Sequence, residues 1–190
     1  METKEEIKWD GEFGALERIT FVSDLLNKQV EIRNMLDLRT NIMIGFNSAL
    51  IVFFASNFKA EWANSVFFVA ALAAIVISML FALMALKPSH FVSKKGQKES
   101  LFYHHQIDSK SEEAYKKEIL ETMGDETKIY SAYILETYNL TSFSNVPRKY
   151  YLNWSIRVLL YGIFISLALY LISLAPAFIS GTLNLPQIKF

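Results

Sequence analysis

Three long stretches of the chain carry no charged side chain. They cover residues 40–58, 62–86 and 158–187, and the apolar part of the last one ends near Ile179. An α-helix rises about 1.5 Å per residue, so roughly 20 residues cross a hydrocarbon core about 30 Å thick. A domain of this length has too little interior to bury three such helices away from water. The pattern therefore predicts an integral membrane protein with three spanning helices.

The segments around these stretches complete an all-α fold. We expect a long cytosolic N-terminal helix over residues 1–39 and a small, mainly helical cytosolic insert over residues 87–146, between spans two and three. The spans themselves are expected over 40–58, 62–86 and 147–179, the last with a cytosolic lead-in, and residues 180–190 form an external tail.

Within the insert, capping residues predict two helices. Ser109 or Ser111 starts the first, which Gly124 ends, and the second runs from Asp125 to about Leu140. Before them, residues 101–107 suit a short strand or an extended segment. Pro147 is expected in the first turn of the third spanning helix, where its missing N–H costs nothing.

The distribution of positive charge predicts the orientation in the membrane. Seventeen of the 19 lysines and arginines lie before the first span or between spans two and three, and only Lys59 and Lys189 lie on the other side. Cytosolic segments of membrane proteins carry this excess. We therefore expect a multi-pass membrane protein with its N-terminus in the cytosol and its C-terminus outside.

The N-terminal helix has an apolar seam at alternating steps of three and four residues. Its members are Val22, Leu25, Gln29, Ile32 and Leu36. Such a seam is typical of helices that pair along their length. Two interpretations stay open: the helix packs on its own chain, or it associates with copies of itself.

The first span carries small and polar side chains on or near one face, among them Asn41, Gly45 and Ser48. Small residues let helices approach closely, and polar groups in a span are costly unless they meet another helix or water. The face either packs within one subunit, or it meets other subunits or lines a pore. Asp37 and Arg39 lie at its cytosolic entrance.

Nothing in the sequence points to catalysis. The chain has no cysteine, and its three histidines show no metal-binding spacing. It also lacks a nucleophile elbow and a glycine-rich phosphate loop. We expect neither an enzyme, nor a metal site, nor a nucleic-acid polymer as partner.

A basic and aromatic group in and after the insert is the candidate ligand site. It comprises Lys94, Lys95, Lys98, Phe102, Tyr103, Arg148 and Lys149. The positive-inside rule accounts for these cations by itself. An anionic ligand with a planar ring would also use cations together with a stacking aromatic side chain.

The order of several sequence runs resembles the transmembrane Pycsar effector family, the PycTM-type proteins of bacterial anti-phage defence. The runs are LDLRTNIMIGFNSALIVFF (36–54), ALKPSHFVSKKGQKESLFYHHQI (85–107), SEEAYKKEI (111–119) and YILETYNLTSFSNVPRKYYLNWSIRVLLYGI (133–163). Residues that match the family's pattern are Leu86, Pro88, Phe102, Ile107, Ser111, Tyr115, Lys149 and Tyr150. One departure is Arg39–Thr40, which stands after Asp37 where the family has Lys-Ala.

The resemblance implies a dormant inner-membrane effector. A partner cyclase would make cyclic CMP or cyclic UMP on infection, and the effector would bind this ligand, form a homo-oligomer and disrupt the bilayer. The host then stops growing before the phage matures. The main alternative is a constitutive membrane scaffold or small channel subunit whose insert binds a protein, and a third is a toxin held in check by a protein partner.

Overall fold

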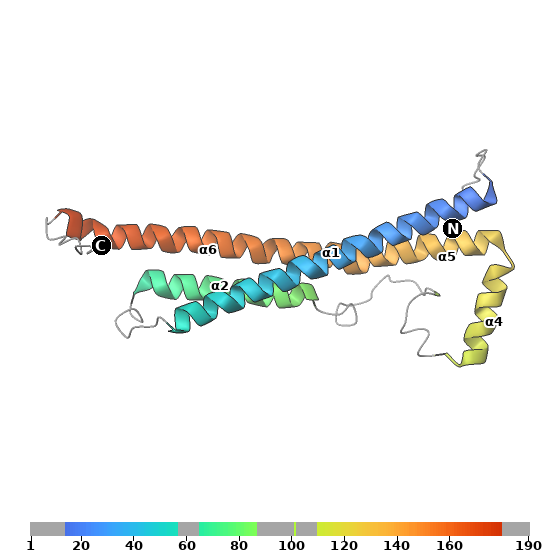
Figure 1. The fold of residues 1–190 in the computed structure, drawn as a ribbon, viewed down its shortest axis with the longest axis horizontal. Coiled ribbons are helices and arrows are strands. Elements are labelled where there is room, and N and C mark those ends of the chain that lie inside the picture. The colour runs from blue at the N-terminus through green and yellow to red at the C-terminus, as the bar shows by residue number, and fades with distance from the viewer. Residues whose placement is uncertain (1–13, 57–64, 87–100, 102–109, 180–190) are drawn as a thin grey trace, which may run out of the picture. The chain divides into compact units, whose positions relative to one another are not determined.

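The computed structural model describes residues 14–56, 65–86, 101 and 110–179, and every regular element in these ranges is helical. The elements are α1 (Ala15–Ser56), α2 (Val66–Leu86), α4 (Glu112–Met123), α5 (Glu126–Asn139), the π-helical segment η3 (Leu140–Asn145) and α6 (Val146–Ile179) (Figure 1). The all-α prediction is thus confirmed for the part of the chain that the structure describes.

The helices form two compact units, and α1 and η3 each contain a boundary between them. We call the unit of residues 14–32, 101 and 110–143 the polar unit. The unit of residues 33–56, 65–86 and 144–179 is called the apolar unit. Both α1 and the helix that leads into α6 therefore contribute to both units.

Three helices are long and apolar enough to cross a membrane. They cover Leu16–Ser56, Val66–Leu86 and Glu126–Ala175. Each covers the greater part of one of the charge-free stretches that the sequence analysis identified. The prediction of three candidate spans is confirmed, and two of the helices continue well beyond the stretch that suits the bilayer.

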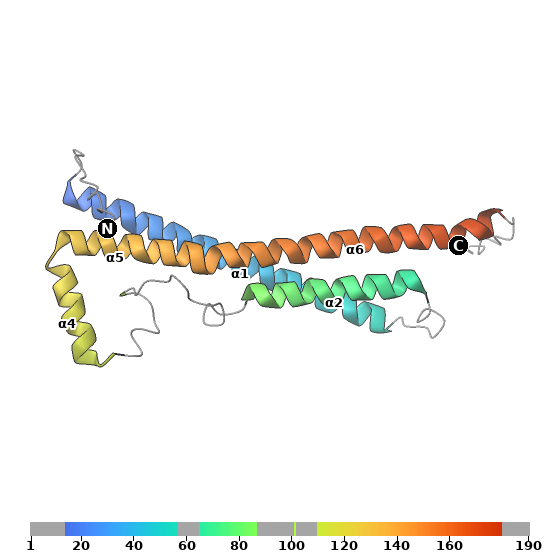
Figure 2. The ribbon, with the colours of Figure 1, turned by 180° about the vertical axis from the view of Figure 1, so that it is seen from behind.

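The third of these helices contains no loop between the predicted insert and the predicted span. Helix α5 passes through η3 directly into α6 (Figures 1 and 2), so Pro147 lies in a continuous helix rather than at a fresh helix start. A proline inside an α-helix lacks one N–H and crowds the carbonyl of the turn before it. In a π-helical turn the hydrogen bonds skip one more residue, and the wider turn lies directly before Pro147.

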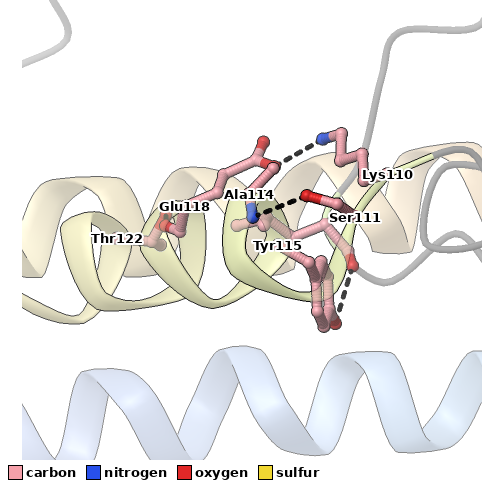
Figure 3. A network of polar contacts seen from close by, with 7 residues as sticks. Lys110, Ser111, Ala114, Tyr115, Glu118 and Thr122 are labelled. Carbon is pink, nitrogen blue, oxygen red and sulfur yellow. Dashed lines mark hydrogen bonds and ion pairs between the residues drawn. The ribbon is translucent and has the colours of Figure 1, made fainter.

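In the polar unit, capping fixes the ends of α4 and α5. The Ser111 hydroxyl accepts a hydrogen bond from the Ala114 N–H at 3.3 Å (Figure 3), so Ser111 rather than Ser109 caps α4. Gly124 ends α4, and Asp125 caps α5 by accepting from the Thr127 N–H at 2.9 Å. These ends agree with the predicted ones because capping depends on residues that are close in sequence.

The segment predicted to be extended lies mostly outside the described residues. Leu101 is described and occupies a turn, and its carbonyl accepts a hydrogen bond from the Tyr115 hydroxyl at 3.4 Å. An ion pair between Lys110 and Glu118 also holds the start of α4 (Figure 3). Both contacts tie residues before α4 to its first turns.

In the apolar unit, α2 and α6 run antiparallel, side by side (Figures 1 and 2). Gly162 of α6 lies so close to α2 that a Cβ added there would be 2.0 Å from the Cβ of Ala74. Aromatic rings also meet along the pair: Phe67 lies 5.2 Å from Tyr170, and Phe81 stacks on Trp154 at 6.2 Å between ring centroids. Small residues at a close crossing are typical of helices that pack in a membrane.

The outer surface of the apolar unit consists of large apolar side chains. Those that are at least half exposed include Phe46, Phe53, Val69, Leu80, Phe164 and Leu167. A water-soluble protein rarely exposes so much continuous apolar surface, whereas lipid tails solvate it well. This surface therefore supports a position inside a bilayer.

Candidate functional site

The interior of the apolar unit contains polar as well as apolar side chains. The largest side chains that are fully buried are Asn47, Thr40, Ser78 and Ser155, and none of them carries a charge. They come from α1, α2 and α6, so all three helices contribute. They share the interior with buried apolar residues such as Ile75, Ala82 and Leu159. We call these four residues the polar seam.

Within the seam, the serines of α2 and α6 bond to each other reciprocally. The Ser78 hydroxyl donates to the Ser155 carbonyl at 2.9 Å, and the Ser155 hydroxyl donates to the Ser78 carbonyl at 2.8 Å. The two hydroxyl oxygens are 3.0 Å apart. Hydrogen bonds between spanning helices contribute about 0.6 to 2 kcal/mol each. The pair therefore reinforces the α2–α6 contact made at Gly162.

Helix α1 joins the seam through Asn47. Its side-chain Nδ2 donates to the Ser78 hydroxyl at 3.0 Å. Its Oδ1 is buried and has no hydrogen-bond partner among the residues that the structure describes. A buried acceptor without a partner costs about 1–3 kcal/mol. The connection of α1 to the other two helices is thus incomplete, unlike the serine pair.

Thr40 occupies the seam without joining helices. Its hydroxyl donates to the Leu36 carbonyl of its own helix at 2.7 Å, so its hydrogen-bonding capacity is used locally. The seam therefore holds three kinds of polar group. Thr40 bonds within its own helix, Ser78 and Ser155 bond to each other, and Asn47 has a partner for its Nδ2 but none for its Oδ1 among the described residues.

An ion pair connects α1 with the first turn of α6. Arg148 donates from Nη1 to Oδ1 of Asp37, 111 residues away in the chain. The Arg148 side chain is only 11% exposed, and that of Asp37 is 34% exposed. Burial lowers the pKa of the Arg148 guanidinium, which precedes the charge-free stretch of α6, and the charge of Arg33 lowers it further. A positive Arg33 thus lies near the pair, and two cations surround one carboxylate.

In the polar unit, Arg18 of α1 contacts α5 twice. Its Nη2 lies 3.5 Å from Oε1 of Glu126, and its guanidinium lies 5.6 Å from the centre of the Tyr130 ring. The Tyr130 hydroxyl donates to the same Glu126 carboxylate. The group fastens the start of α1 to the start of α5, and the buried Nε of Arg18 has no hydrogen-bond partner among the described residues.

Most of the candidate ligand residues lie outside the described residues. These are Lys94, Lys95, Lys98, Phe102 and Tyr103. Of the remaining two, Arg148 is held by Asp37, and Lys149 is exposed at the next position of α6. The structure thus separates the roles of these neighbours: the first makes an internal ion pair and the second is available to solvent.

The predicted seam of α1 faces its own chain in part. Leu36 is buried, Val22, Gln29 and Ile32 are half-buried, and Leu25 is exposed. Four of the five positions are at least partly buried in the single chain, so packing on its own chain accounts for part of this pattern. Self-association along this seam stays a prediction.

Two asparagines of α1, Asn41 and Asn47, lie about 120° apart around the helix axis. Asn41 and Gly45, which the sequence analysis placed on a common face, are exposed, and Ser48 is half-buried. Asn47, which was not among the predicted face residues, is the fully buried one. A Cβ added at Gly45 would meet nothing within 4 Å. The predicted face is thus an outer surface of the single chain.

The described residues contain no group of three or more His, Cys, Asp or Glu side chains that could hold a metal ion.

A model of the PycTM family, described as the Pycsar effector protein domain, matches residues 23–175. The chain belongs to this family. No curated protein and no solved structure matches it.

Membership of the PycTM family indicates the function of the protein that contains the polar seam. It implies a membrane effector of anti-phage defence that responds to a cyclic nucleotide from a partner cyclase. Transmembrane effectors of this family are generally not enzymes. The matched range includes both halves of the ion pair and all four residues of the seam.

Proposed function

We propose that this PycTM protein is a dormant effector of the bacterial inner membrane that a cyclic pyrimidine mononucleotide, cyclic CMP or cyclic UMP, activates. Activation impairs the membrane and stops the infected cell before the phage matures. The match of the family over residues 23–175 carries the proposal. The three candidate spans with a polar interior support it, because membrane impairment needs helices that can rearrange within the bilayer. The N-terminus and insert lie in the cytosol, and the C-terminus lies in the periplasm.

The ligand site of this proposal is the basic and aromatic group of the insert. A cyclic mononucleotide has one phosphate charge and one flat base. Lys94, Lys95 and Lys98 would meet the phosphate through charge-assisted hydrogen bonds, and Phe102 or Tyr103 would stack on the base. Of the two described members of this group, Lys149 is the one that is exposed to solvent.

Replacing Lys94, Lys95 and Lys98 together by Gln is expected to raise the Kd for cyclic CMP or cyclic UMP. Each lost charged contact contributes about 1.5–3 kcal/mol, and every 1.4 kcal/mol is about a tenfold change. Calorimetry on the purified full chain measures the Kd, with cyclic AMP as the comparison ligand. The same variant should lose protection in cells that are infected while the partner cyclase is expressed.

The matched control is Lys116→Gln with Lys117→Gln, which removes exposed charges of the same kind from α4. This control should bind and protect as the wild type does. Unchanged ligand binding in the triple variant would place the ligand elsewhere. If neither pyrimidine nucleotide binds, and the cyclase makes no difference to survival, the protein fits a scaffold, a channel subunit or a protein-held toxin better.

Self-association in this proposal uses the outer face of the first span, formed by Asn41, Gly45 and Ser48. An exposed asparagine in a span is costly in lipid unless another helix meets it, and the open space at Gly45 lets a second backbone approach. Gly45→Leu is therefore expected to abolish cross-linked multimers in native membranes while the single chain stays folded.

Phe46→Leu is the control for this experiment, since Phe46 is also exposed but lies about 100° around the helix from Gly45. It should leave cross-linking unchanged. Multimers of equal yield in the Gly45→Leu variant would show that the chains meet through a different surface.

A further inference from the structure

The polar seam is concentrated where a membrane protein usually places small or apolar packing residues. Asn47, Ser78 and Ser155 have no exposed surface at all, although lipid-facing leucines and phenylalanines surround the unit. Polar groups inside a span mark either contacts between helices or a route for water and ions. The serine pair is a contact between helices, because each hydroxyl donates to the carbonyl of the serine on the other helix, across the α2–α6 interface.

Asn47 is not accounted for in the same way. It gives one hydrogen bond to Ser78 and buries its Oδ1 without a partner among the described residues. Water would satisfy this oxygen at once, because a water molecule in a protein interior needs two to four polar partners and the seam offers an amide and two hydroxyls. In the arrangement of the structure, the Asn47 Oδ1 therefore lacks a hydrogen bond that a water molecule in the seam would supply.

The contacts among the three helices differ in strength. Helices α2 and α6 are joined by the reciprocal serines, by two pairs of aromatic rings and by the close approach at Gly162. Within the apolar unit α1 is joined to them by the Asn47 amide, the Asp37–Arg148 pair and the contact of Phe54 with Phe68. Helix α1 is thus the element that separates most readily.

We propose that separation of α1 from the α2–α6 pair opens a water-filled path for small inorganic ions, lined by Thr40, Asn47, Ser78 and Ser155. The proposal rests on the membrane-impairing function and specifies its route and its permeant class. The lining is uncharged, so the path has weak preference between cations and anions. Small ions pass, and dyes of several hundred daltons do not.

The chain supplies a matched pair of probes for this route. Asn41 and Asn47 are the same residue type in the same span, but Asn41 is exposed on the outer face and Asn47 is buried in the seam. A carboxylate beside a conducting path attracts cations and repels anions, whereas a carboxylate away from the path leaves selectivity unchanged. The position whose charge changes selectivity therefore lies on the path.

The experiment uses the full-length protein in liposomes, with a potassium chloride gradient and with cyclic CMP and cyclic UMP as the added probes. Potassium flux and release of trapped carboxyfluorescein are measured together. We expect nucleotide-dependent ion flux without dye release. In Asn47→Asp the reversal potential should shift toward that of potassium. Asn41→Asp also alters the proposed self-association face, so its total flux is expected to fall, but the reversal potential of the remaining flux should stay at the wild-type value.

A second measurement does not depend on the aspartate variants. The chain has no cysteine, so Ser78→Cys provides a single thiol, for which a charged, membrane-impermeant reagent is the probe. The thiol should be protected without nucleotide and labelled with it. A thiol that stays protected while ions flow would overturn the proposal, because the flow would then bypass the seam.

The other outcomes are equally decisive. A selectivity shift in Asn41→Asp but not in Asn47→Asp would place the path on the outer face, between subunits. Dye release as fast as ion flux would mean general rupture, which keeps the proposed function and rejects the path. Absence of any leak with both nucleotides would reject the path and the proposed function together.

Discussion

Reversing the charge of Asp37 alone, or of Arg148 alone, is expected to destabilise the apolar unit and to arrest growth without infection. Asp37→Arg places a third cation beside Arg148 and Arg33, and Arg148→Asp places two carboxylates together. Breaking a largely buried pair costs about 3–5 kcal/mol, and the partial exposure of Asp37 reduces this to about 2–4 kcal/mol. Thermal unfolding in detergent and growth of uninfected cells measure the two effects.

The double variant Asp37→Arg with Arg148→Asp restores opposite charges and should recover most of the stability and the dormancy. Arg39→Asp is the control, because Arg39 is exposed on α1 two residues after Asp37 and carries the same change of sign. If the single variants unfold at the wild-type temperature and stay silent in cells, the pair does not hold α1 in place. A double variant as unstable as the single ones would mean that the charges act through other groups.

Gly162→Leu is expected to separate α2 from α6 and to abolish the folded apolar unit. Even the Cβ of an alanine would lie 2.0 Å from the Cβ of Ala74, so the helices have to move apart. Overpacking of this kind costs about 1–3 kcal/mol for small additions and more for a leucine. The yield of protein that remains monodisperse after heating in detergent measures the loss.

Gly162→Ala allows a compensating change, because Ala74→Gly removes the methyl group that it meets. The pair of changes together should restore the heat resistance that Gly162→Ala loses. Gly45→Ala is the control, since a Cβ there meets nothing within 4 Å and alanine favours the helix by about 1 kcal/mol. Equal heat resistance in Gly162→Ala and the wild type would contradict the close crossing.

The sequence predicts the spans well because their signal is local. Each charge-free stretch is long enough to identify a helix by itself, and Ser111 and Asp125 act as caps on residues within three positions. The continuous helix through Pro147 could not be predicted from the sequence, because a proline after a polar insert is typical of a helix start. The π-helical turn that accommodates it gives no sequence pattern of its own.

The interior contacts could not be predicted, because they depend on how separate helices align. Asp37 and Arg148 were both noticed, one at the entrance of the first span and one as a ligand candidate, but 111 residues separate them. In the first span, helical spacing grouped Asn41 with Gly45 and Ser48 on or near one face. Only the helical rotation imposed by packing shows that Asn47 is the asparagine that points inward.

The incomplete attachment of α1 sets the energy that a signal has to supply. Lipid tails solvate an apolar helix as well as another helix does, so separation in a bilayer loses only specific contacts. Moving a two-state equilibrium from 1:99 to 99:1 takes about 5.5 kcal/mol of differential binding. A ligand with a micromolar Kd has about 8 kcal/mol in total. The specific contacts that hold α1 within the apolar unit, which include the Asp37–Arg148 pair, the Asn47–Ser78 hydrogen bond and the Phe54–Phe68 contact, are therefore within the reach of a single small molecule.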